Sequence, residues 1–405
     1  RALVMERYEE YKDSGVEWIG EIPRGWGAAA AKRWARISNG SNPTTNGNTP
    51  VYGSSGVAFK TCGESKQAPA VLLGRKGTIG SPSYIDHPYW NVDTAFDVKT
   101  DEEVLKLRYY FYLATCFDYA RYQTNTTVPS MTQTDYEDMI IPLPSVIEQQ
   151  AIAGYLDAKT VEIDALVADC ERAVDLLREY RKAVISEAVT KGLNPDVPTK
   201  DSGIEWIGKI PVSWAIVPFK AIGTVAANLQ HPSDYPDVPQ VSPDRIEKDS
   251  GRLLPCVSVA EAGVESDNHL FHAGDILYSK VRPALNKVTV APFDGMCSAD
   301  MYPIVTAQNR NWLVCYMLSN AFMEQVIVST ARVKMPKINK EELGTFKVVL
   351  SDADAQIKIA AYLDAKTAEI NSLIDAKQSM VDKLREYRRS LISEAITGKF
   401  KVPGV

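Results

Sequence analysis

Residues 155–190 read YLDAKTVEIDALVADCERAVDLLREYRKAVISEAVT, and residues 362–397 repeat them as YLDAKTAEINSLIDAKQSMVDKLREYRRSLISEAIT. The two copies are identical at 21 of 36 positions. Neither copy contains Pro or Gly, and Gly192 and Gly398 lie just past their ends, where helices commonly terminate. Each copy therefore predicts one long helix of about 54 Å, at about 1.5 Å of rise per residue.

Residues spaced alternately by three and four along each copy predict the a and d seam of a coiled coil. The predicted seam of the first helix is Leu156, Lys159, Ile163, Leu166, Cys170, Ala173, Leu177, Tyr180 and Val184. The predicted seam of the second is Leu363, Lys366, Ile370, Leu373, Lys377, Met380, Leu384, Tyr387 and Leu391.

The apolar stripe on both helices is wider than a two-helix seam needs, which predicts additional neighbours. These neighbours are either the chain's own globular blocks or helices of a partner subunit. The candidate partner-docking residues are Val167, Val174, Ile185, Val189, Ile374, Val381, Ile392 and Ile396.

A second repeat precedes each helix at a distance. KDSGVEWIG at residues 12–20 returns as KDSGIEWIG at residues 200–208, and both copies continue to Ile-Pro and then a Trp. Between the repeats lie two blocks that share almost no sequence beyond their C-terminal edges. A duplicated frame with two diverged inserts fits one scaffold that presents two different recognition surfaces.

The predicted domain organisation follows this pseudo-twofold repeat. It consists of an N-terminal repeat segment (1–26), a first block (27–147), a central long helix (148–192), a linker with the second repeat segment (193–214), a second block (215–354) and a C-terminal long helix (355–400).

Each block is predicted to be a small sheet with flanking helices, so the fold class is α/β (α+β). Short apolar runs punctuated by Gly and Pro predict strands at Ala70–Gly74, Gly77–Tyr84, Asp275–Ser279, Val288–Ala291 and Met301–Val305. Helical patterns follow them at Glu103–Thr115 and Trp312–Val328.

Composition places limits on the partners. The chain has 405 residues, of which 45% are apolar and 24% charged, as is typical of globular proteins. It contains no run of 18 apolar residues and no secretory leader pattern, and its six cysteines are scattered, so we expect a cytoplasmic protein without a disulfide framework. A net charge of −6 argues against coating nucleic acid by bulk attraction, but it allows local basic patches.

Basic and polar residues cluster at equivalent places in the two blocks. They follow the strands that end at Gly74 and Ser279, and they flank Pro129 and its counterpart Pro336. Loops of this kind on a rigid sheet suit contacts with phosphates and base edges, although each loop taken singly fits a solvated surface as well. The candidate DNA-binding residues are Arg75, Lys76, Thr78, Asn125, Thr127, Ser130, Lys280, Arg282, Lys287, Arg332, Lys334, Lys337 and Lys340.

The motifs of common enzymes are missing. The sequence holds no GxxxxGK[ST] nucleotide loop, no amino-methyltransferase motif and no convincing nuclease arrangement. The GxxG run at Gly74–Gly77 lacks the following helix of a KH domain. His269 and His272 have no acidic or Cys ligand set nearby, so we expect surface residues and no metal site. We therefore predict a chain without catalytic residues that recognises and positions.

The sequence resembles the specificity (S) subunits of type I restriction-modification enzymes over essentially its whole length. The resemblance is carried by the doubled KDSG(V/I)EWIG segment with its Ile-Pro, by the two LREYR helices, by Pro142-Leu143-Pro144 with Glu148-Gln149, and by GDILYSKVRP at residues 274–283. The second copy departs from the pattern, because Leu350-Ser351 and Ala355-Gln356 replace the Leu-Pro and Glu-Gln of the first.

The resemblance implies two target-recognition domains that each bind half of a split sequence in double-stranded DNA. Two antiparallel coiled-coil helices would set the distance between them. It further implies two methyltransferase subunits and restriction (motor and nuclease) subunits as partners. This chain would carry no cofactor, and S-adenosylmethionine, ATP and Mg would be bound by the partner subunits. On the residues alone, a two-headed coiled-coil adaptor for proteins or glycans fits the repeats equally well, whereas the missing motifs disfavour a fused methyltransferase.

Overall fold

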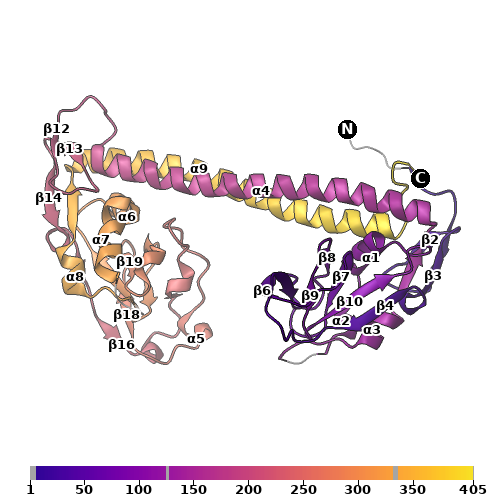
Figure 1. Ribbon diagram of the computed structural model, residues 1–405. Coiled ribbons are helices and arrows are strands. Elements are labelled where there is room, and N and C mark those ends of the chain that lie inside the picture. The colour runs from indigo at the N-terminus through magenta and orange to yellow at the C-terminus, as the bar shows by residue number, and fades with distance from the viewer. Residues whose placement is uncertain (1–5, 125–126, 332–335, 405) are drawn as a thin grey trace. The chain divides into compact units, whose positions relative to one another are not determined.

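A computed structural model describes residues 6–124, 127–331 and 336–404. The chain divides into two compact units: unit 1 is Arg1–Cys170 with Ser379–Val405, and unit 2 is Glu171–Gln378. Two long helices, α4 (Val146–Lys191) and α9 (Ala353–Ile396), contribute residues to both units (Figure 1). The predicted long helices are thereby confirmed. Each is followed by a glycine in the left-handed conformation, Gly192 at φ 81° and Gly398 at φ 70°.

Unit 1 contains a central antiparallel sheet in the order β4-β10-β7-β8. A smaller sheet, β6-β5-β9, and the pairs β1–β2 and β3–β11 complete its strands. The strands of unit 1 are β1 (Tyr11–Asp13), β2 (Glu21–Pro23), β3 (Gly27–Ala30), β4 (Ala35–Asn39), β5 (Thr49–Tyr52), β6 (Ala58–Cys62), β7 (Ala70–Gly74), β8 (Ser83–Ile85), β9 (Trp90–Asn91), β10 (Ala95–Thr100) and β11 (Ile140–Leu143). Its short helices are α1 (Leu107–Ala114), α2 (Tyr119–Tyr122) and α3 (Gln133–Asp138), and α1 lies against β7 and β8.

Unit 2 repeats the central sheet in the same order, β15-β22-β19-β20. Its second sheet differs, because it has four strands in the order β16-β18-β21-β17. The strands are β12 (Thr199–Asp201), β13 (Lys209–Pro211), β14 (Ala215–Pro218), β15 (Thr224–Val225), β16 (Leu229–Gln230), β17 (Gln240–Val241), β18 (Asn268–Phe271), β19 (Ile276–Ser279), β20 (Val288–Val290), β21 (Gly295–Cys297), β22 (Met301–Val305) and β23 (Lys347–Leu350).

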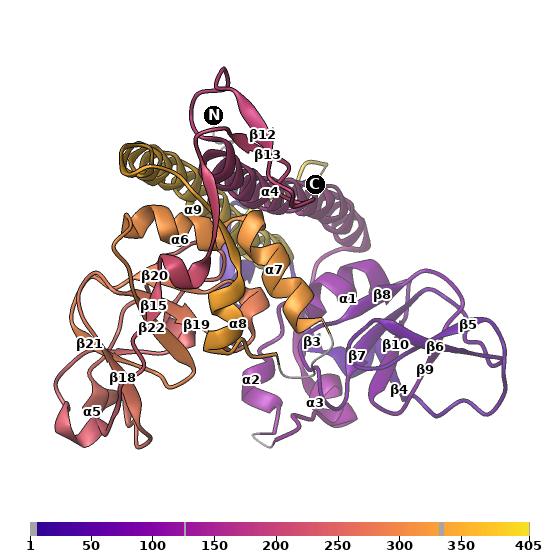
Figure 2. The same ribbon diagram turned by 90° about the vertical axis from the view of Figure 1, so that its left-hand side faces the viewer.

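In unit 2, α6 lies against β20 and packs on α7 (Figure 2). The helices of this unit are α5 (Val259–Ala262), α6 (Arg310–Leu318), α7 (Asn320–Thr330) and α8 (Lys340–Thr345). Short 3₁₀ turns are Ala31–Arg33, Phe219–Ala221, Pro232–Asp234, Pro243–Arg245 and Pro283–Leu285. Within the described ranges, no helix is long and apolar enough to cross a membrane. The mixed α/β prediction for both blocks is confirmed.

Three predicted elements are wrong in extent. The helix predicted over Glu103–Thr115 begins only at Leu107, the first residue of α1. The run Gly77–Tyr84 is a loop up to β8, since Gly77 and Gly80 adopt φ of 87° and 84°. The helix predicted over Trp312–Val328 is two helices, α6 and α7, because the backbone at Ser319 is extended and its hydroxyl donates to the carbonyl of Tyr316 at 2.6 Å.

The long helices pack antiparallel within each unit, because residues early in one helix meet residues late in the other. In unit 1, Ile152 and Leu156 of α4 share a buried core with Leu391 and Ile396 of α9. Unit 2 has the equivalent core, which includes Ile185, Val189, Ile359 and Leu363. Burying each such aliphatic side chain contributes about 1.5–3 kcal/mol to stability.

The predicted seam is wrong at five of its positions. The buried or half-buried line on α4 runs Leu156, Thr160, Ile163, Val167, Cys170, Val174, Leu177 and Arg181, and the line on α9 runs Leu363, Thr367, Ile370, Ile374, Lys377, Val381, Leu384 and Arg388. The predicted seam residues Leu166, Tyr180, Leu373, Met380 and Tyr387 are instead exposed. Thr160 and Thr367 are buried or half-buried at little cost, because each hydroxyl donates to the carbonyl four residues earlier, at 2.7 and 2.6 Å. Lys159 and Lys366 instead turn to Glu162 and Glu369.

The candidate partner-docking residues are mostly covered by the chain itself. Ile185, Val189, Ile392 and Ile396 are buried in the cores of their own units, and Val174 and Val381 are buried as well. Val167 and Ile374 are half-buried on the observed seam. Side chains already covered offer no surface to a partner subunit, so the structure favours the other interpretation of the wide stripe, which is contact with the chain's own blocks.

Candidate nucleic-acid interface

In unit 1 the polar loop after β7 is hydrogen-bonded to the segment around Pro129. The amide of Gly77 donates to the carbonyl of Pro129 at 2.9 Å, and the amide of Met131 donates to the carbonyl of Arg75 at 3.0 Å. Lys76 and Ser130 form a β-bridge between these two contacts. The structure therefore brings the predicted residues Arg75 and Lys76 together with Ser130, on two segments that are far apart in sequence. Thr78 and Thr127 lie on the same two segments, within two residues of these contacts.

Arg75 is fixed within this loop. Its amide donates to the carbonyl of Thr94 at 2.8 Å, and its Nη1 donates to the carbonyl of Asp93 at 3.1 Å. The guanidinium also lies 5.9 Å from the centre of the Phe96 ring. Lys76, Thr78 and Thr127 are exposed and Ser130 is half-buried. A restrained arginine beside exposed polar side chains suits contact with the phosphates of a DNA backbone.

Unit 2 makes the same contacts with different side chains. The amide of Lys280 donates to the carbonyl of Asp300, that of Arg282 to Pro336, and that of Ile338 to Lys280, each at 3.0 Å. Val281 and Lys337 form the β-bridge that corresponds to Lys76 and Ser130. Arg282 thus occupies the position of Gly77, and Lys280 that of Arg75. One loop architecture carries basic residues in both units.

The remaining predicted DNA-binding residues divide into three groups. Lys337 lies in the cluster and pairs with Asp300 at 3.3 Å. Lys287 is turned away from it, since its Nζ donates to the carbonyl of Pro243 at 2.6 Å, and Lys340 is exposed at the first residue of α8. Asn125, Arg332 and Lys334 lie outside the described residues.

The charge of Lys280 acts on His269, which is not the surface residue that the sequence predicted. His269 was expected at the surface, but it is buried on β18, where its Nδ1 accepts from the amide of Asn228 at 3.2 Å. Burial and, secondarily, the positive charge of Lys280 hold the pKa of His269 below its ordinary value. His272 is exposed as expected. Among the residues that the structure describes, no group of three His, Cys, Asp or Glu side chains is arranged to hold a metal ion.

Arg282 combines charge with an unfavourable backbone conformation. Its φ of 45° lies in the left-handed region, and its counterpart in unit 1 is a glycine at φ 87°. A side chain in this region costs about 1–2 kcal/mol, and glycine avoids that cost. An exposed arginine kept in such a conformation fits a residue retained for contact rather than for stability.

We expect Arg282→Gly and Arg282→Ala to weaken DNA binding equally, because both remove the guanidinium. The free energy of unfolding of the Gly variant should be about 0.5–1 kcal/mol higher than that of the Ala variant, because glycine tolerates the positive φ of this position. Urea unfolding and duplex binding of the two variants measure both effects. Equal stability of the two variants would show that position 282 is unstrained, and unchanged binding would remove Arg282 from the interface.

One part of this surface, the β5–β6 hairpin of unit 1, was not predicted from the sequence. Its turn reaches the interface loop, where the Thr78 amide donates to Ser54 Oγ at 3.4 Å. The hairpin carries an exposed Phe59, 59% accessible, followed by Lys60. An aromatic residue on an otherwise polar, exposed strand is the only signal that the sequence alone offered.

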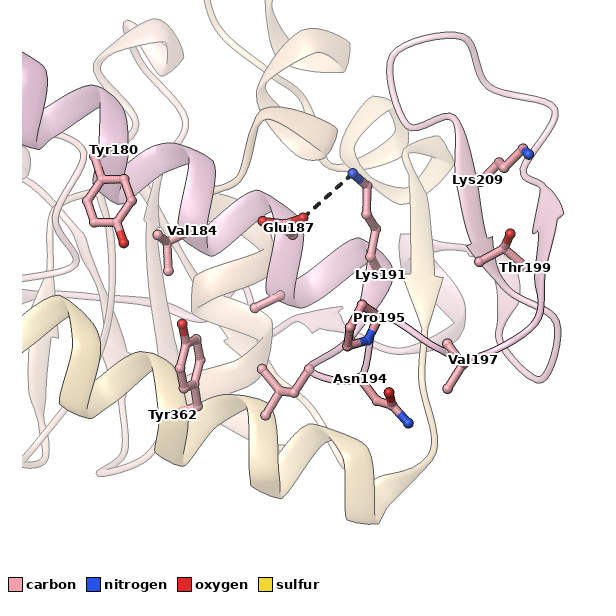
Figure 3. A pocket seen from close by; sticks show the side chains of 13 residues that line it. Tyr180, Val184, Glu187, Lys191, Asn194, Pro195, Val197, Thr199, Lys209 and Tyr362 are labelled. Atoms are coloured by element: carbon pink, nitrogen blue, oxygen red, sulfur yellow. Dashed lines mark ion pairs between the residues drawn. The ribbon is translucent and has the colours of Figure 1, made fainter.

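A cavity of about 770 Å³ lies apart from these loops, at the C-terminal end of α4 in unit 2. Tyr180 and Tyr362 project toward each other there from α4 and α9, and Glu187 pairs with Lys191 on its wall (Figure 3). In unit 1 the counterpart of Tyr362 is Tyr155, whose ring packs edge-on against Phe400 at 6.1 Å between centres. Leu193 stands at the position of Phe400 in unit 2, and its smaller side chain leaves the space open.

The chain is similar to known proteins at the level of family and fold. Residues 30–165 match the family of type I restriction modification DNA specificity domains. The type I restriction enzyme EcoDI specificity subunit of Escherichia coli is 29% identical over 289 residues, which cover 68% of this chain and 65% of that one. The MjaVIII specificity subunit of Methanocaldococcus jannaschii is 20% identical over 362 residues, covering 84% of this chain and 78% of the relative. The chain thus spans just under two thirds of the EcoDI subunit's length.

A solved structure extends the likeness to the whole fold. A chain from a study of complex assembly and conformational transition in a type I R-M system matches with a TM-score of 0.70 at 15% identity, over 94% of this chain and 99% of that one. The predicted fold, with two α/β domains and two long helices, is therefore similar to the fold of that chain. The family match covers residues 30–165, and the similarity to specificity subunits and to the solved chain extends over most of the remaining sequence.

Proposed function

We propose that this chain is the DNA sequence-specificity subunit of a type I restriction-modification system and performs no catalysis itself. One observation carries the proposal: the same hydrogen-bonded loop pair presents basic side chains in both units, around Arg75 in unit 1 and around Lys280 in unit 2. Because the side chains differ while the backbone contacts persist, the two units would read two different half-sites of a split target. The specificity-subunit relatives support this function over a protein- or glycan-binding adaptor.

The partners we propose are double-stranded DNA, two methyltransferase subunits and the restriction subunits. Each unit leaves exposed apolar side chains on the long helices, Val161, Leu166, Met380 and Tyr387 in unit 1 and Leu176, Tyr180 and Leu373 in unit 2. These replace the buried residues first considered for docking. Leu166 and Leu373 are equivalent in the repeat, as are Tyr180 and Tyr387, so each unit offers one docking surface of the same kind. This equivalence supports two methyltransferase subunits per chain.

The cofactors we propose all belong to the partner subunits. S-adenosylmethionine would supply the methyl group in the methyltransferase subunits, while ATP and Mg would serve the restriction subunits. The contribution of this chain is to hold the half-sites in register by phosphate contacts and to discriminate bases by its loops. A protein that acts on the host's DNA in this way would be located in the cytoplasm.

The function is tested by electrophoretic mobility shift of a randomised duplex library, using the full chain with and without its methyltransferase subunit. Because the net charge is −6, we expect weak binding by the chain alone and specific retention by the assembly. Sequencing the retained duplexes should give a motif of two half-sites separated by a fixed spacer. A contiguous motif, or no enrichment at all, would contradict the proposed function.

Lys280 provides a test of the interface. Lys280→Ala should weaken binding of the selected duplex and reduce the slope of log affinity against log salt by about 1, because one phosphate contact is lost. It should also raise the pKa of His269, because a positive charge that disfavours the imidazolium is removed. Salt titration and proton NMR of the histidine measure these effects. A raised His269 pKa with an unchanged salt slope would mean that Lys280 lies near His269 but not against DNA.

A further inference from the structure

The two units share their central sheet and differ in the second one. In unit 1 the second sheet is β6-β5-β9, in which β5 and β9 run parallel, and unit 2 has the same parallel pairing between β17 and β21. In unit 1, β6 pairs with β5 on the side opposite β9. In unit 2, the sheet is instead extended by β18 and β16 on the side of β21. Because the central sheets of the two units are equivalent, we expect residues of the differing second sheets to make the two DNA half-sites different.

The β6 strand is an edge strand whose apolar side chain faces solvent. Ala58, Phe59, Lys60 and Thr61 are all exposed, and the strand is covered only at Cys62. Proteins usually place charges on exposed edges and keep large apolar side chains off them, because such an edge can pair with another chain. An aromatic ring retained there, beside an equally exposed Val57, points to contact with a partner.

A β-bulge turns Phe59 out of the strand pattern. Lys60 pairs with Val51 and Ala58 pairs with Tyr52, so Phe59 has no partner residue on β5. Bulges of this kind re-aim a side chain and are enriched beside functional sites. The ring lies over Gly53, where a side-chain carbon would come 3.8 Å from Phe59 Cε1, and Lys60 Nζ stands 5.6 Å from the ring centre.

The hairpin is continuous with the interface loop of unit 1. Besides the bond from the Thr78 amide to Ser54, a side-chain carbon at Gly77 would stand 3.4 Å from Ser54 Oγ. The turn is held close to β8 as well, since a side-chain carbon at Gly56 would overlap Ser83 Oγ at 1.8 Å. The hairpin and the Arg75–Thr78 loop therefore form one surface, and a duplex bound to the loop would lie within reach of the hairpin.

We propose that Phe59 is a specificity-determining residue for the half-site read by unit 1. Its ring makes an apolar contact with the edge of a base, of the kind that a thymine methyl group accepts in the major groove. Lys60, on the same strand, contacts a neighbouring phosphate and so orients the hairpin on the backbone. This inference rests on the proposed function, because it requires that unit 1 bind DNA.

The test is selection from a randomised duplex library by the assembled complex, using the wild-type chain, Phe59→Ser and Phe59→Leu. We expect Phe59→Ser to lose about tenfold discrimination at one position of the first half-site and to leave the second half-site and the spacer unchanged. Phe59→Leu keeps an apolar side chain and should retain part of the preference. The side chain is exposed, so the midpoint of thermal unfolding should stay at the wild-type value.

The matched control is Leu229→Ser, which removes an apolar side chain that is 51% exposed on the edge strand β16 of unit 2. It should leave the first half-site intact. Retention of full discrimination by Phe59→Ser would overturn the inference while the split motif of the wild-type chain upheld the proposed function. A wild-type chain that selects no split motif would overturn both, and loss of first half-site discrimination in Leu229→Ser would show that the effect of Phe59→Ser is not local.

Discussion

Removing one heptad from each long helix is expected to shorten the spacer of the DNA target and to leave both half-sites unchanged. Residues 170–176 of α4 and 377–383 of α9 are equivalent in the repeat, so deleting both preserves the four-three phase of the observed seam. Each helix would lose about 10 Å of length. Because DNA rises about 3.4 Å per base pair, the spacer should shorten by up to about three base pairs.

Methylome sequencing of cells that express the doubly deleted chain with its methyltransferase subunit measures the outcome. Methylation of the original sites should be lost, and any motif that remains should carry the original half-sites. The control is the deletion in α4 alone. It leaves α9 residues without their α4 partners, so the two helices no longer match and methylation should be abolished. An unchanged spacer in the double deletion would refute a role of the helices in setting the separation.

The long helices were predictable because their signals are local and doubled. Two similar runs of the same length contain no Pro or Gly and are each followed by a glycine, which is the pattern typical of a long helix. The domain limits drawn from the repeat stay predictions, although α4 and α9 begin within two residues of the predicted helices. The helix break at Ser319 was not predicted, because the apolar pattern continues across it. The break depends on the tertiary packing of α6 and α7.

The predicted seam was wrong at five exposed positions because a hydropathy pattern ranks residues one at a time. Leu166 and Tyr180 are more apolar than Thr160 and Arg181, so a pattern search selects them. In the folded chain a threonine can satisfy its hydroxyl on its own helix, and Arg181 finds partners on α9 and on a loop of unit 2. Satisfied polar groups therefore lie on the seam, while the leucine and tyrosine are left outside.

The candidate interface was predictable in its loops but not in its pairing. Polar residues after β7 and β19 were visible as composition, and the offset between Pro129 and Pro336 indicated that the segments correspond. That each loop bonds to its distant segment through equivalent amides depends on backbone geometry, which composition does not encode. The bulge that exposes Phe59 is equally invisible, because it is a matter of register between β5 and β6.

One polar contact between the two long helices differs between the units. In unit 1, Arg388 forms a two-point ion pair with Asp164, with Nε and Nη2 donating at 2.8 and 3.2 Å. The equivalent residues of unit 2 are Arg181 and Asn371, so the carboxylate is replaced by an amide, whose Oδ1 accepts from Arg181 Nη1. Arg181 is only 5% exposed, and burial lowers its pKa below the ordinary value.

A loop of unit 2 compensates for the missing carboxylate. Arg181 Nη2 donates to the carbonyl of Asp249 at 3.0 Å, and Lys182 pairs with the Asp249 carboxylate at 3.1 Å. Arg252 on the same loop stands 3.6 Å from Asp375 of α9. The α/β domain of unit 2 is therefore held on both helices by polar contacts in addition to its apolar core, and Arg181 is the buried member of these contacts.

We expect Arg181→Ala to lower the free energy of unfolding of unit 2 by about 2–3 kcal/mol, because two hydrogen bonds from a buried charge are lost. Hydrogen exchange of the loop at residues 247–252 should accelerate in the same variant. The repeat supplies the control: Arg388→Ala breaks a half-exposed ion pair and should cost about 1 kcal/mol or less. That smaller cost should fade at high salt, where the exposed pair is screened, whereas the cost of Arg181→Ala should persist. Equal losses in the two variants, or an unchanged exchange rate of the loop, would mean that the buried arginine does not hold the α/β domain of unit 2 on its helices.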